Sequence, residues 1–233
     1  MKKLLATVAV LAAVAIAAYF MLQNPLGRLV KLAIEEFVPE MTQTAVRISK
    51  VEISTDGRGA LFGLVLGNPK GFKSDYALKA GVIDIALEPA SLARDVVVIH
   101  KVLINAPRIG YEKADGITNF DAIQRNIEKY LGANRDKDGK AGENGGKKMI
   151  IGSLVIRNAR VNYNDTLELT LPDIELRNVG KKTGGATSAQ VVRAIITELN
   201  IKLTLALAKA AVIGSVGGVV IGAGAAIKSL LGD

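Results

Sequence analysis

His100 is the single histidine of this 233-residue chain, which contains no cysteine. Because histidine and cysteine supply most general bases, nucleophiles and zinc ligands, acid–base, thiolate and zinc chemistry have few residues to use here. His100 lies in an apolar run, where a lone histidine is usually a hydrogen-bonded structural residue. We therefore expect no catalytic residue, no metal site and no cofactor. A turnover that is lost on His100→Ala would contradict this expectation.

Three Asp-Gly pairs, which begin at Asp56, Asp115 and Asp138, are the other candidates for ion binding. None has the downstream glutamate of a calcium loop, so each pair is interpreted as a turn. The net charge of +8 does not indicate nucleic-acid binding, because the basic residues are not interleaved with aromatic ones. Membrane phospholipids with anionic head groups are the better partner, and a solvated basic surface is the alternative.

The N-terminus predicts a membrane anchor. Lys2 and Lys3 precede an uncharged run, Leu4 to Leu22, which as a helix is about 28 Å long and matches the hydrocarbon core of a bilayer. The lysines predict a cytoplasmic N-terminus. The alternative is a cleaved signal peptide, because Ala15-Ile16-Ala17 fits a cleavage site. Both interpretations place the rest of the chain outside the cytoplasm, and we expect a bacterial inner-membrane protein with a single anchor and its bulk in the periplasm.

Changes in hydrophobic periodicity divide the remaining chain. They predict an α+β fold with an N-terminal transmembrane helix, a curved, mainly antiparallel β-sheet with an inserted helix, and a C-terminal helix. The predicted segments are 1–23 (anchor), 24–44 (amphipathic helix), 45–130 (first part of a β-rich domain), 131–148 (flexible loop), 149–180 (second part of that domain) and 187–233 (C-terminal helical apolar segment).

The helices are predicted from apolar stripes and capping residues. In the segment 24–44 the stripe is Leu29, Leu32 or Ala33, Phe37 and Met41, and the helix either lies on the membrane or closes one end of the domain. Thr118 and Asp121 have the spacing of a capping box before the inserted helix, and Ser188 caps the last one. Residues 210–227 carry no charge. They form a second span, an amphipathic or re-entrant helix, or a domain-packing helix.

An internal similarity links two stretches of the β-rich region. "IHKVLINAPRIGYE" from Ile99 and "IGSLVIRNARVNYN" from Ile151 share an apolar frame and three identities. These identities match Ile104 with Ile156, Arg108 with Arg160 and Tyr111 with Tyr163. The alternative is a chance likeness of two alternating hairpins. A true repeat of a strand–turn–strand unit predicts an extended sheet and not a closed catalytic fold.

Several of these stretches resemble the N-terminal region of the AsmA-like proteins of the bacterial envelope. The resemblance covers about residues 1 to 180 and is carried by "GLVLGNPKGF", by "DIALEPASLARDVVVIHKVLINAPRIGYE" and by the helix start "TNFDAIQRN". Long members of that family build an extended β-groove. The resemblance implies phospholipid movement or envelope homeostasis, with envelope proteins as further possible partners.

We therefore expect a non-catalytic protein that handles lipid, in which apolar strand faces shelter acyl chains and basic residues hold phosphates. The expected lipid-contacting residues are Leu61, Leu64, Leu66, Ile83, Ile85, Val98, Ile104 and Ile156. The same residues would form the core of a closed domain. The alternative function is accordingly a structural or interaction domain, similar to the water-stress-type β-sandwiches, that binds no lipid.

Overall fold

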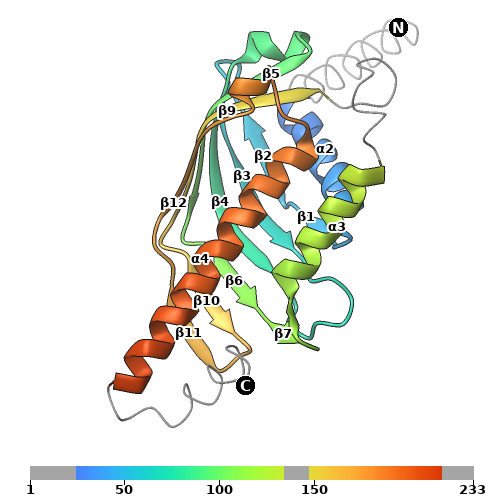
Figure 1. The fold of residues 1–233 in the computed structure, drawn as a ribbon. Coiled ribbons are helices and arrows are strands. Elements are labelled where there is room, and N and C mark those ends of the chain that lie inside the picture. Colours follow the sequence, from blue (N-terminus) through green and yellow to red (C-terminus); the bar gives the residue numbers. More distant parts are fainter. Residues whose placement is uncertain (1–24, 134–146, 217–233) are drawn as a thin grey trace, which may run out of the picture.

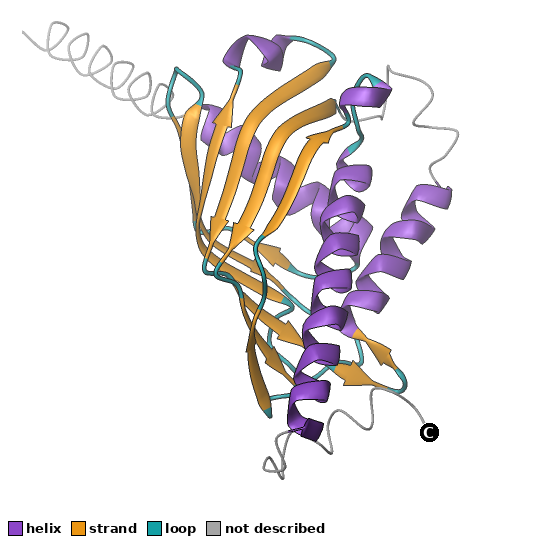
Figure 2. Ribbon diagram, turned by 60° about the vertical axis from the view of Figure 1, so that its left-hand side comes forward, coloured by secondary structure: helices purple, strands orange, loops and turns teal. Residues whose placement is uncertain are grey.

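The computed structural model describes residues 25–133 and 147–216. Over these residues the chain has an α+β fold, with three α-helices against the inner face of a curled sheet (Figures 1 and 2). The helices are α2 (Pro25–Thr42), α3 (Asn119–Ala133) and α4 (Ser188–Val216), with short 3-10 helices η1 (Pro89–Ala93) and η2 (Lys181–Thr183).

The ten strands of the curled sheet run in the order β11-β10-β6-β4-β5-β9-β12, while β3 pairs with β4 and with both β1 and β2. These strands are β1 (Val46–Arg47), β2 (Lys50–Ile53), β3 (Arg58–Leu66), β4 (Leu78–Leu87), β5 (Val96–Asn105), β6 (Arg108–Tyr111), β9 (Lys148–Arg157), β10 (Arg160–Tyr163), β11 (Leu167–Thr170) and β12 (Ile174–Val179). A separate hairpin joins β7 (Lys113–Ala114) to β8 (Ile117–Thr118).

The large sheet is mixed but mainly antiparallel, as predicted, because seven of the nine strand pairs described in it are antiparallel. Two parallel pairs, β5 with β9 and β6 with β10, lie in its middle. Their registers place Ile104 beside Ile156, Arg108 beside Arg160 and Tyr111 beside Tyr163. The internal similarity in the sequence is therefore a structural repeat, whose two strand–kink–strand units stack side by side in register.

Both units bend at the same point. Ala106 and Asn158 each have a positive φ, near +50°, between the two strands of their unit. The amide of Ala106 donates to Arg157 O at 2.8 Å, and the amide of Arg160 donates to Pro107 O at 2.9 Å. Because these hydrogen bonds continue the ladder through the bend, the sheet curls without losing backbone pairing.

Apolar side chains line the inner face of the curl. One row, in ladder register, crosses six strands and is buried at every position. A second row, one pleat along, packs against the same core. Full burial of each such side chain contributes about 1.5–3 kcal/mol to folding. We call these two rows the apolar trough; they consist of Val51, Leu61, Ile83, Ile104, Ile156 and Ile174, and of Ile85, Val102, Leu154 and Leu176.

Helix α2 packs on the domain through a different stripe from the predicted one. The residues that face the core recur every three or four positions along the helix, and they are Leu26, Val30, Ile34, Val38 and Met41. Of the predicted stripe, Met41 is buried and Phe37 is half-buried, whereas Leu29, Leu32 and Ala33 are exposed. Because α2 is apolar on two sides, its periodicity allows either face to be buried, and contact with β1 and β2 selects one.

The starts of α3 and α4 are both capped. Thr118 and Asp121 form the predicted capping box: the amide of Asp121 donates to Thr118 Oγ1 and the amide of Thr118 to Asp121 Oδ2. At α4 the cap is Thr187 and not Ser188, because the amide of Gln190 donates to Thr187 Oγ1 and Gln190 Oε1 accepts from the amide of Thr187. From there α4 buries Ile196, Leu199, Leu203 and Leu207.

No helix within residues 25–133 and 147–216 combines the length and the apolar character needed to cross a membrane. The predicted anchor, 1–23, lies outside the described residues, as do most of the predicted loop 131–148 and the last seventeen residues of the segment 187–233.

Candidate functional site

The residues predicted to contact lipid lie mainly in the core. Leu61, Leu66, Ile83, Ile104 and Ile156 are buried, and Leu64 and Ile85 are half-buried against them. Val98 is half-buried and lies outside the core cluster. The structure therefore brings seven of the eight residues together, but under the helices and not on an open face.

Helix α4 covers the part of the trough formed by β9 and β12 (Figure 1). Polar ties fix its middle turn. The Tyr111 hydroxyl, from β6, donates to Asn200 Oδ1 at 3.2 Å, and Asn200 Nδ2 donates to Asp121 Oδ1 at 2.8 Å. Asn200 thus connects α4 both to the sheet and to the start of α3.

The loop after β3 is held by one buried carboxylate, that of Glu112. Its Oε2 accepts from the Ser74 amide at 2.7 Å and from Ser74 Oγ at 2.6 Å, while the Lys73 amide donates to Oε1 at 2.8 Å. Charge-assisted hydrogen bonds of this kind are stronger than neutral ones. The loop that contains the Asn-Pro and Gly-Phe of the sequence pattern is therefore clamped to the end of β6.

A fully buried amide, that of Asn119, completes this clamp. Its Oδ1 accepts from the amides of Glu112 and Phe120, both at 3.1 Å, and its Nδ2 donates to Gly110 O and to Asn68 Oδ1. Asn68 in turn donates from Nδ2 to Ser74 O at 2.7 Å. Asn119 therefore joins the loop, β6 and the first turn of α3.

The carboxyl groups in these networks have lowered pKa values. Burial alone would raise the pKa of Glu112, but the hydrogen bonds from Ser74 and Lys73 outweigh burial and hold the pKa below its ordinary value. For Asp121 burial also acts upward, and the hydrogen bonds from Thr118 and Asn200 outweigh it. Both carboxyl groups therefore stay ionised to lower pH than free carboxyl groups do. This agrees with a structural role, in which the ionised groups accept hydrogen bonds.

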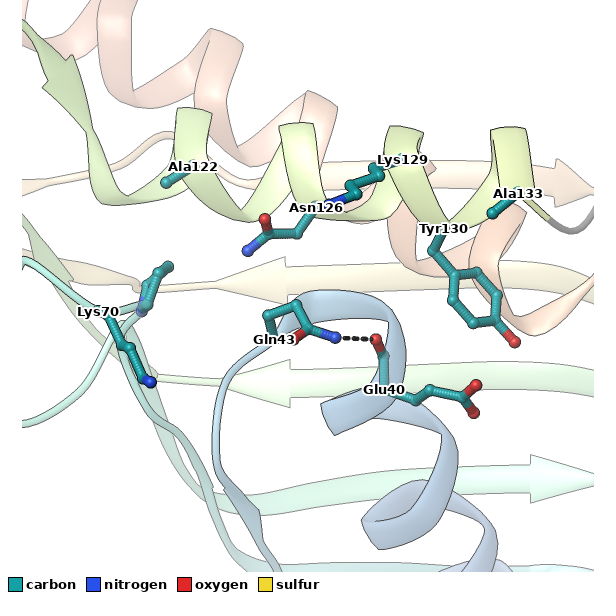
Figure 3. A pocket seen from close by; sticks show the side chains of 9 residues that line it. Glu40, Gln43, Lys70, Ala122, Asn126, Lys129, Tyr130 and Ala133 are labelled. Carbon is teal, nitrogen blue, oxygen red and sulfur yellow. Dashed lines mark hydrogen bonds between the residues drawn. The ribbon is translucent and has the colours of Figure 1, made fainter.

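A polar groove of about 590 Å³ lies between the end of α2, the loop at Pro69 and α3. Figure 3 shows Asn126 and Tyr130 of α3 directed toward the last turn of α2 and Lys70 on the opposite wall. The Asn126 amide donates to Thr42 O at 2.9 Å, so it ties the two helices together. Two lysines, Lys70 and Lys129, face this groove with one carboxylate, that of Glu40.

A basic cleft of about 460 Å³ lies between the first turns of α2 and strand β2. It is lined by the cations Arg28, Lys31 and Lys50 together with Glu52. Lys31 donates to Ser49 O at 3.3 Å and lies 3.9 Å from Glu35, and Lys50 is paired with Glu52. Three cations therefore gather at the helix start, balanced in part by two carboxylates.

His100 is exposed on β5, next to the position where the β4–β5 register shifts. Among the residues that the structure describes, no three His, Asp or Glu side chains gather as metal ligands would.

The sequence interpretation missed the buried anchors Glu112 and Asn119 and the basic cleft. Asn119 lies inside the recognised capping box, between Thr118 and Asp121, so the sequence placed it at the helix start but did not indicate its burial. The cleft forms between α2 and β2, and no local pattern marks that contact.

No family model matches this chain, and no curated protein matches it.

Proposed function

We propose that this chain is an inner-membrane-anchored envelope protein that handles phospholipid without a catalytic step, and that the apolar trough is the lipid-contacting surface. Support comes from the resemblance of its strand and loop patterns to AsmA-like proteins. The uncharged N-terminal run and the excess of basic residues agree with contact with anionic lipid.

The observation that carries the proposal is the continuity of the trough. Its two rows run without a polar residue along a curled inner face, one across six strands from β2 to β12 and the other across four strands from β4 to β12. An acyl chain requires an elongated apolar surface of this kind, because each buried methylene contributes about 0.8 kcal/mol.

Lipid reaches the trough only when α4 moves, because α4 covers the β9–β12 side. The polar ties of α4 at Asn200 are few, and its outward side keeps Ile201 and Leu205 exposed. We infer that α4 is a displaceable cover over the trough.

A photoactivatable phospholipid tests this proposal. The full chain is reconstituted in vesicles that contain a phospholipid with a diazirine on its acyl chain, irradiated, and mapped by peptide mass spectrometry. Labelling of the peptides that contain Leu154 and Leu176, the trough residues on the β9–β12 side, is the expected result. Labelling that is restricted to outward residues such as Val82, which is 44% exposed on β4, would refute the role of the trough.

Two variants test the movement of α4. Glu128 of α3 and Arg193 of α4 form an exposed ion pair at 3.6 Å, and the chain has no cysteine. In Glu128→Cys/Arg193→Cys a short bis-maleimide joins the two helices, and we expect labelling of the trough to fall several-fold. The two single-cysteine variants, treated with the same reagent, are the controls and should label like the unmodified chain. Asn200→Ala should raise labelling, because it frees α4 from Tyr111.

One observation favours the alternative function, a structural or interaction domain. The helices bury the trough in the described structure, as in a closed domain. If no bound or cross-linked phospholipid is found, and if melting is cooperative and independent of added lipid, this alternative holds.

A further inference from the structure

The two leucines nearest the start of α2 face outward. Leu29 is 64% exposed and Leu32 is 54% exposed, which places both among the most exposed large apolar residues that the structure describes. They lie three positions apart and therefore share one side of the helix, opposite the stripe that packs on the sheet. Exposed leucines on one side of a helix, next to basic residues, are typical of a helix that lies in a membrane interface.

The charges on α2 are asymmetric. Arg28 and Lys31 flank the exposed leucines, and Lys50 of β2 lies on the other wall of the basic cleft. The carboxylates of the helix, Glu35, Glu36 and Glu40, all lie in its second half. The basic, apolar half is the half that follows the uncharged run, which ends at Leu22, only three residues before Pro25.

We propose that the first two turns of α2 and the basic cleft form a docking surface for an anionic phospholipid bilayer. Leu29 and Leu32 enter the boundary between head groups and acyl chains, and Arg28, Lys31 and Lys50 hold lipid phosphates. This arrangement fixes the orientation of the domain on the membrane. It rests on the proposed membrane attachment, but it does not require lipid in the trough.

Two features indicate that an anionic bilayer binds this surface: its charge, and the short stretch of chain between Leu22 and Pro25. Three cations beside two exposed leucines match the layered chemistry of an anionic leaflet, with phosphates outside and acyl chains within. A chain that leaves a bilayer at Leu22 brings Pro25 to its surface, because three extended residues span only about 10 Å. Glu35 and Glu52 neutralise part of the cleft, so binding depends on the cations as a group.

The test uses single cysteines in the otherwise cysteine-free full chain. Leu29→Cys and Leu32→Cys carry an environment-sensitive fluorophore; Val82→Cys and Ile201→Cys, at exposed positions on β4 and α4, are the comparison sites. Each protein is reconstituted in phosphatidylcholine vesicles with or without phosphatidylglycerol and with quencher-labelled lipid. With phosphatidylglycerol, the probes at 29 and 32 should be quenched and those at 82 and 201 should not.

A matched pair of triple variants isolates the charge. Arg28→Gln/Lys31→Gln/Lys50→Gln should lower the docked-to-undocked ratio on the order of 100-fold, since each cation near an anionic leaflet contributes about fivefold. The control Lys101→Gln/Arg157→Gln/Arg177→Gln removes three exposed cations elsewhere and should leave quenching unchanged.

The proposal is overturned if the probes at 29 and 32 are quenched no more than those at 82 and 201, or if both triple variants respond alike. Failure of trough labelling with normal quenching at 29 and 32 would refute the proposed function alone. Normal trough labelling with no quenching at these two positions would refute only the docking surface.

Discussion

The side chain of Asn119 donates a 2.7 Å hydrogen bond to the side-chain oxygen of Asn68, which lies fifty-one residues earlier in the chain. Asn68 is the second residue of the loop after β3, and Asn119 is the first residue of α3. The contact therefore connects two sequence features, the Asn-Pro that ends a strand and the Thr-Asn that starts a helix. Its geometry explains why both are asparagines: one amide oxygen accepts while its neighbour's amide nitrogen donates.

Asn119→Ala should lower the free energy of unfolding by about 2–4 kcal/mol, because it leaves four polar partners, three of them in buried residues, without their hydrogen bonds to this side chain. Urea unfolding of the full chain in detergent, followed by circular dichroism, measures this loss. The matched control is Asn105→Ala, which removes one exposed hydrogen bond from Asn158 and should cost less than about 1 kcal/mol. Equal losses for the two variants would contradict the role of Asn119 as an anchor.

Glu112 should make the stability depend on pH. Its folded-state pKa is lowered, so its carboxylate stabilises the fold above the unfolded-state pKa of about 4.3, and this stabilisation is lost as pH falls toward the folded-state pKa. We expect Glu112→Gln to be less stable than the natural chain at pH 7 and to lose less stability on acidification below pH of about 5. Urea midpoints measured across this range test both expectations.

The control for Glu112 is Glu175→Gln, which changes an exposed carboxylate paired with Arg177. Its pH profile should follow that of the natural chain. A Glu112→Gln profile that is parallel to the natural one would show that the carboxylate does not contribute through its charge.

Gly57 and Gly71 have similar backbone conformations but differ in how closely other atoms approach them. Substitutions at the two positions therefore distinguish the cost of the conformation from the cost of a steric clash. Both have a positive φ, +84° and +98°, but a Cβ on Gly57 would lie 2.1 Å from Leu87 O, whereas a Cβ on Gly71 would meet nothing within 4 Å. Gly71→Ala should therefore cost about 1 kcal/mol, and Gly57→Ala about 3 kcal/mol or more. Thermal or urea unfolding compares them directly. Similar losses would mean that the turn at Gly57 moves away from β4 without cost.

Ile156→Ala should be far more destabilising than Ile150→Ala on the same strand. Ile156 is 1% exposed in the trough row, whereas Ile150 is half-buried outside the core cluster. Truncation of a buried isoleucine costs about 2–5 kcal/mol, and we expect less than half of that at Ile150. A loss at Ile156 of below about 1 kcal/mol would indicate that the trough is loosely packed in the resting protein.

Much of the local structure was predictable. The alternation of Ile83 and Ile85 predicted β4, Asp56-Gly57 predicted the turn before β3, and the capping box at Thr118 predicted the start of α3. These features depend on residues close together in the chain, so a local pattern is enough to recognise them. The repeat was also visible, because matching positions are fifty-two residues apart throughout.

The candidate site was predictable only in part. Periodicity identified Leu61, Ile83, Ile104 and Ile156 as one apolar face, but whether that face meets lipid or α4 depends on a helix that begins more than thirty residues after Ile156. The basic cleft was not predicted at all, because its two walls come from α2 and β2 and meet only in the folded chain.

The sequence alone determined the strand and helix periods, the turns and the capping box of α3, since each of these is set by short-range sterics and hydrogen bonding. It also showed the existence of a repeat, through identical residues at a constant spacing. The tertiary structure decided three things: that the repeats stack in parallel, that Leu26 and not Leu29 faces the core, and that α4 lies over the trough. Each of these choices has an alternative of similar local free energy, and only packing between distant segments separates them.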